Sequence, residues 1–112
     1  MTKTLSIQTD DHGYYHATEN FSPPGPFGFH VDIYLTLTAP PGTRVEGSVA
    51  LNSEGGGSPQ SKTFVADTGT KISLGSWYIP HASNIAVVTG QTSPSLVNTG
   101  ITFDLEADVT GF

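Results

Sequence analysis

The clearest pattern in the chain is a strict alternation of apolar and polar side chains between positions 29 and 51. Residues 29–38 form a first arm in which every second side chain is apolar, and residues 44–52 repeat the pattern. Successive side chains of a strand point to opposite faces, so each arm is predicted to be a strand with one face to bury. Pro40-Pro41-Gly42 cannot continue a strand, because proline lacks the amide donor and glycine favours turns. The two arms are therefore expected to form a β-hairpin.

Six further segments read as short strands, because they alternate in the same way or are rich in β-branched or aromatic residues. They are residues 4–8, 14–18, 62–66, 71–79, 84–89 and 101–110. Asp67-Thr68-Gly69-Thr70 contains a glycine and is expected to be a second hairpin connection, between residues 62–66 and 71–79. Apolar residues nowhere recur at the three-and-four spacing of a helix.

These strands predict an all-β fold, with residues 1–112 forming one domain, an antiparallel β-sandwich of seven to eight strands. An immunoglobulin-like arrangement is the first expectation, and a jelly roll or partly open barrel is the second. The cysteines of true immunoglobulin domains are absent, so that label describes the architecture alone.

The composition is poor in charge: 12% of residues are charged and the formal net charge is −6. The four basic residues, Lys3, Arg44, Lys62 and Lys71, are scattered, which argues against nucleic-acid binding and against attraction to anionic membranes. No segment approaches the roughly 20 apolar residues of a membrane helix, and no signal peptide is visible, so a soluble cytoplasmic protein is the default expectation. Cysteine is absent, which excludes disulfides and thiolate metal sites.

Two pairs of adjacent aromatic residues are candidate ligand-binding positions: Tyr14 with Tyr15, and Trp77 with Tyr78. Adjacent residues of a strand face opposite ways, so one member of each pair should be in the core. If Tyr78 faces inwards, Trp77 is exposed, unless a bulge at Gly75 exchanges the faces. An exposed aromatic ring on a sheet can stack on a sugar or hold a protein partner. The alternative is that Trp77 is a core residue.

Five acidic residues are candidate metal ligands. Asp104, Glu106 and Asp108 lie on one face of the last predicted strand, and Asp10 and Asp11 could join them if the terminal strands are neighbours. Calcium binds six to eight oxygen ligands, so it is the one cofactor that these residues suggest. The alternative is that the charges guard an exposed sheet edge against pairing with another chain.

The sequence favours a non-enzymatic binding module that holds a glycan or a protein through a sheet face or its loops. The first alternative is a structural subunit of a surface layer or phage-like particle, which would need only stable sheets and edges. A small metal-dependent hydrolase is a distant third, because the sequence shows no convergent nucleophile, base and orienting group.

Overall fold

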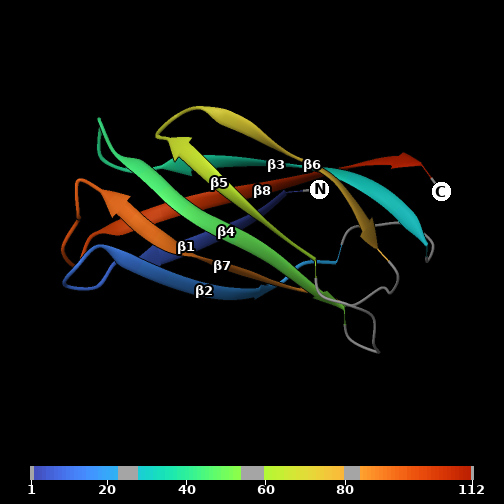
Figure 1. Ribbon diagram of the computed structural model, residues 1–112, viewed down its shortest axis with the longest axis horizontal. Coiled ribbons are helices and arrows are strands. Elements are labelled where there is room, and N and C mark those ends of the chain that lie inside the picture. The colour runs from blue at the N-terminus through green and yellow to red at the C-terminus, as the bar shows by residue number, and fades with distance from the viewer. Residues whose placement is uncertain (1, 23–27, 54–59, 80–83, 112) are drawn as a thin grey trace.

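The computed structural model describes residues 2–22, 28–53, 60–79 and 84–111, which form eight β-strands (Figure 1). The strands are β1 (Thr2–Gln8), β2 (Tyr14–Asn20), β3 (Phe29–Thr38), β4 (Arg44–Ser53), β5 (Gln60–Asp67), β6 (Lys71–Ile79), β7 (Asn84–Ser93) and β8 (Gly100–Gly111). Every strand expected from the sequence is present. The described part of the chain contains no helix that could cross a membrane.

The strands form two four-stranded sheets, and all pairings within them are antiparallel. Sheet A has the order β1-β8-β3-β6, and sheet B has the order β2-β7-β4-β5. The predicted antiparallel sandwich is confirmed. Its strand order is that of a jelly roll, the second arrangement expected, in which eight strands are divided between two sheets.

The hairpin expected at Pro40-Pro41-Gly42 is wrong. β3 pairs with β6 and β8 in sheet A, whereas β4 pairs with β5 and β7 in sheet B, so this turn carries the chain from one sheet to the other. The second hairpin, expected at Asp67-Thr68-Gly69-Thr70, is wrong for the same reason, because β5 lies in sheet B and β6 in sheet A. Thr68 ties the two connections together, because its hydroxyl accepts from the amide of Ala39 at 2.9 Å and donates to the Ala39 carbonyl at 3.0 Å.

The core lies between the sheets and takes one apolar face from each. The alternating residues of β3 and β8 are buried, as the sequence pattern predicts, and so are those of β4. Phe21, in the segment after β2, is completely buried and anchors that segment on the core. The polar residues between these positions face outwards and form the two outer faces of the sandwich.

Candidate functional site

Two rows of outward-facing side chains cross all four strands of sheet B. The register of the strands places Tyr14, Gln91, Glu46 and Val65 in one row. It places His16, Thr89, Ser48 and Thr63 in the next row. Glu46 and His16 are the only ionisable side chains besides the phenol of Tyr14 in these two rows. These two rows therefore offer hydroxyl and amide groups with little charge.

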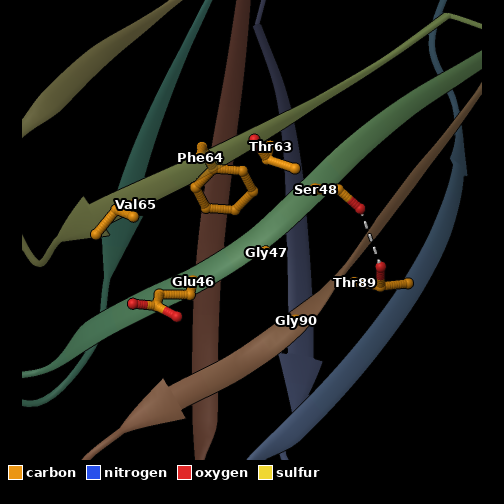
Figure 2. Close-up of a pocket in the computed structure, with 8 residues that line it drawn as sticks. All are labelled: Glu46, Gly47, Ser48, Thr63, Phe64, Val65, Thr89 and Gly90. Carbon is orange, nitrogen blue, oxygen red and sulfur yellow. Dashed lines mark hydrogen bonds between the residues drawn. The ribbon is translucent and has the colours of Figure 1, made fainter.

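A shallow depression lies where these rows cross β4 and its neighbours (Figure 2). Glu46 and Ser48 reach it from β4, Thr63 and Val65 from β5, and Thr89 from β7. The Ser48 and Thr89 hydroxyls are hydrogen-bonded to each other at 3.3 Å, which holds both side chains in place. The depression thus carries one carboxylate and three hydroxyls beside an exposed valine.

Two glycines that face each other across β4 and β7, Gly47 and Gly90, also line the depression. A Cβ atom on either glycine would point into the sandwich and collide with the backbone of the other strand and with the Tyr15 hydroxyl. Tyr15 is therefore packed beneath this glycine pair, with its ring 5.1 Å from that of Phe103. Burial raises the pKa of its phenol, and its oxygen is buried without a hydrogen-bond partner among the described residues.

Of the predicted ligand-binding pair on β2, Tyr14 is on the surface and Tyr15 is in the core. Tyr14 is 51% exposed and belongs to the row that contains Glu46. It lies two strands from Glu46, about 10 Å away at the usual strand spacing. Its backbone is fixed because the Asp10 carboxylate accepts a hydrogen bond from the Tyr14 amide at 3.0 Å. Tyr15 is only 5% exposed and cannot touch a ligand on this face.

Trp77 is also a core residue, at 1% exposure. The register of β6 against β3 shifts between Asp32 and Tyr34, and Gly75 in this region has a φ of 79°. This is the bulge at Gly75 that the sequence left open, and it places both Leu74 and Trp77 inside the sandwich. The indole nitrogen donates a hydrogen bond to the Leu74 carbonyl at 3.1 Å. Trp77 therefore cannot serve as a surface ligand-binding residue.

Tyr78 is exposed, but on the opposite side of the molecule from Tyr14. It lies on the outer face of sheet A, where its ring packs against His30 with the ring centres 5.2 Å apart. Its side chain is 44% exposed. The structure thus separates the two exposed aromatic candidates, and Tyr14 alone shares a face with the depression.

The three acidic residues of β8 do face one way, but β8 lies between β1 and β3, so they do not guard an edge. Asp104 accepts a hydrogen bond from the Thr4 hydroxyl at 2.6 Å. Glu106 forms an ion pair with Lys71 at 2.8 Å, and that pair raises the pKa of the Lys71 ammonium group. Asp108 lies opposite Asp32 in the register. No three His, Asp or Glu side chains in the described part of the chain are placed to hold a metal ion.

Asp10 and Asp11 lie far from these residues, although β1 and β8 are neighbours as the calcium hypothesis required. The strands are antiparallel, so the turn after β1 lies beside the start of β8 and not beside its acidic half. The Asp10 carboxylate accepts hydrogen bonds from the amides of His12 and Tyr14, which lowers its pKa. Asp11 accepts from the Asn98 side chain at 3.3 Å. Both residues have structural partners in the loops.

The fold is similar to that of a known carbohydrate-binding module. The similar structure is that of TmCBM61, solved in complex with β-1,4-galactotriose. The match covers 96% of this chain and 70% of the TmCBM61 chain. The TM-score is 0.50 and the sequence identity is 11%, so the likeness concerns the fold alone. No protein-family model and no curated protein sequence matches the chain.

The side chains that line the depression were not predicted as site residues from the sequence. Glu46 and Ser48 are ordinary polar positions of an alternating strand, and nothing in the sequence connects them with Thr63 or Thr89. Only the pairing of β4 with β5 and β7 brings them together. The Gly47 and Gly90 positions carried a weak signal, since glycine inside a strand often marks a close approach of another backbone.

Proposed function

We propose that this protein is a non-enzymatic glycan-binding module that holds an oligosaccharide on the outer face of sheet B. The observation that carries the proposal is the depression lined by Glu46, Ser48, Thr63 and Thr89, with Tyr14 on the same face. The glycan would lie across the strands, with one part in the depression and another against the Tyr14 ring.

The chemistry of this face suits a sugar. Sugar hydroxyls both donate and accept hydrogen bonds, and serine, threonine and glutamine side chains can do the same. The Glu46 carboxylate adds a strong acceptor, because hydrogen bonds to charged groups are shorter and stronger than neutral ones. Tyr14 offers an apolar ring face with a polar end, the combination that suits a sugar ring.

The fold supports the same class of function. TmCBM61, whose fold is similar over nearly the whole of this chain, has been solved with a galactotriose. Fold alone does not determine function, so the proposal depends on the side chains of sheet B. The galactotriose is a sensible first probe because it is a ligand that this type of scaffold can hold.

The depression offers little for catalysis. Glycoside hydrolysis uses a pair of carboxyl groups on either side of the scissile bond, most often about 5 to 9.5 Å apart. Among the residues that are described as lining the depression, Glu46 is the only acid. A binding role without bond cleavage therefore fits this site better than hydrolysis.

The test is a binding screen against immobilised neutral and acidic oligosaccharides that includes β-1,4-galactotriose, followed by calorimetry on the glycan bound most tightly. Tyr14→Ala and Glu46→Gln should each weaken that binding by about tenfold, the loss expected of a central contact residue. Tyr78→Ala is the matched control, because Tyr78 is similarly exposed but lies on sheet A. Equal losses in Tyr14→Ala and Tyr78→Ala, or a screen without any bound glycan, would contradict the proposal.

A further inference from the structure

A second hollow lies on the other side of β5, between the neighbouring edges of β5 and β6. Its lining includes Thr63, Phe64 and Val65, which also line the depression on sheet B. The two hollows are therefore separated by β5 alone. An oligosaccharide that lies in the depression and continues across β5 would enter this second hollow, which we call the groove.

Lys62 places a fixed positive charge in the groove. Its ammonium group donates a hydrogen bond to the Ser76 carbonyl at 3.2 Å and lies 5.2 Å from the centre of the Trp77 ring. It occupies the space left by Gly75, where a Cβ atom would lie 2.6 Å from Nζ. The Ser76 carbonyl, the Trp77 ring and the space beside Gly75 restrict the Lys62 side chain before any ligand binds. Its side chain therefore loses less conformational entropy on binding a ligand than a fully mobile lysine would.

Within the described part of the chain, Lys62 is the basic residue for which the structure shows no ion pair with an acidic side chain. Lys3 pairs with Glu19, Arg44 with Asp67 and Lys71 with Glu106, at 2.8 to 3.6 Å. Among the described ranges, no carboxylate lies within ion-pair distance of the Lys62 ammonium group. An ammonium group has three donors, and one of them is directed at Ser76.

We propose that this groove is a subsite for a carboxylate group of the bound glycan, with Lys62 as its partner. The proposal rests on the glycan-binding function above and names the ligand class: an oligosaccharide that carries a uronic acid beside a neutral segment. The neutral segment lies in the depression, and the carboxylate lies across β5 at the ammonium group of Lys62.

The net negative charge of the protein opposes the binding of an acidic glycan. At a net charge of −6 the protein repels anions in general, so an acidic glycan without a specific partner should bind more weakly than its neutral counterpart. A preference for the acidic glycan therefore requires a local cation in the site. Lys62 is the described basic residue that lines a hollow next to the depression.

The experiment uses matched pairs of oligosaccharides, each a neutral compound and the same compound with one C6 hydroxyl oxidised to a carboxylate; β-1,4-galactotriose and its oxidised form are one pair. Calorimetry is performed on the wild type, on Lys62→Gln and on Lys71→Gln. The last is the control, since it removes the same charge from the outer face of sheet A. Thermal unfolding verifies that each variant is folded.

We expect the wild type to bind the carboxylate member of the preferred pair about tenfold more tightly, the effect of one charged hydrogen bond. Lys62→Gln should abolish this preference and leave binding of the neutral member unchanged, whereas Lys71→Gln should retain it. Added salt should reduce the preference in the wild type, a measurement that needs no variant.

Three results would overturn the inference. If the wild type binds the neutral member as tightly as the acidic one, or more tightly, the glycan-binding function stands and the carboxylate subsite is ruled out. The subsite is also ruled out if Lys71→Gln loses the preference as fully as Lys62→Gln. If no member of any pair binds, the proposed function fails and the subsite fails with it.

Discussion

The phenol oxygen of Tyr15 lies 2.5 Å from the point at which Gly47 would carry a Cβ atom. The same oxygen is equally close to the corresponding point on Gly90, on the next strand of sheet B. Because Gly47 and Gly90 have no side chains, the Tyr15 ring can fill the space beneath the depression from the core side.

This contact makes alanine at Gly47 costly. The added methyl group would collide with the backbone carbonyl of Thr89 as well as with Tyr15, and a backbone atom in a paired strand cannot turn aside. Gly47→Ala should lower the free energy of unfolding by about 1 to 3 kcal/mol, the usual range for overpacking. Urea denaturation measures this. Gly100→Ala is the control, because nothing lies within 4 Å of its Cβ position; equal losses in both variants would contradict the explanation.

The hydroxyl of Tyr15 should be dispensable for stability. It is buried without a hydrogen-bond partner in the described structure, and a buried polar group that lacks a partner costs about 1 to 3 kcal/mol. Tyr15→Phe retains the ring contact with Phe103 and removes this cost, so its urea midpoint should equal or exceed that of the wild type. A loss of more than about 1 kcal/mol would mean that the hydroxyl has a bonding partner, for example a buried water.

The same hydroxyl should make the fold sensitive to alkali. Burial raises the pKa of Tyr15 above its ordinary value of 10.0, so the unfolded chain releases this proton at a lower pH than the folded protein does. The associated stability is fully present below pH 10 and is lost as the pH rises above it. Stability measured from pH 8 to 11 should fall more steeply in the wild type than in Tyr15→Phe. Parallel curves would show that Tyr15 ionises equally easily in both states.

Replacing Trp77 should test the bulge in β6. Because Trp77 is buried, Trp77→Ala should lower the free energy of unfolding by about 3 to 5 kcal/mol. The adjacent Tyr78→Ala removes an exposed ring and should cost less than about 1 kcal/mol. Chemical denaturation of both variants gives the comparison. The reverse order would mean that β6 presents the opposite face to the core.

The sequence predicted the strands and most of their faces because alternation is a local property. Ile33 and Leu35 are buried in β3, and Phe103 and Leu105 are buried in β8, as their spacing requires. Which sheet a strand joins is not local. Pro40-Pro41-Gly42 ends β3 and reverses the chain whether the next strand pairs with β3 or packs against it from the other sheet, and in this fold it packs against it.

The candidate site was harder to predict than the fold. The sequence left open whether Trp77 faces outwards, and a single extra residue at Gly75 decides that it lies in the core, since the faces of a strand alternate with a period of two. The depression depends on Glu46, Thr63 and Thr89, which come from three strands and meet through their register. Their residue types are common on any polar sheet face, so no local motif marks them.

The pairing of β1 with β8 has a consequence for how the chain can fold. β8 lies between β1 and β3, so β1 cannot join sheet A until β8 has been synthesised. On the ribosome, the backbone hydrogen-bonding groups of β1, and those along one edge of β3, must therefore stay without their sheet partners until β8, about 100 residues after β1, has been made. Such distant pairings make folding slow and leave strands exposed in the meantime. A nascent chain stalled before Gly100 should then depend on chaperones that cover bare strands.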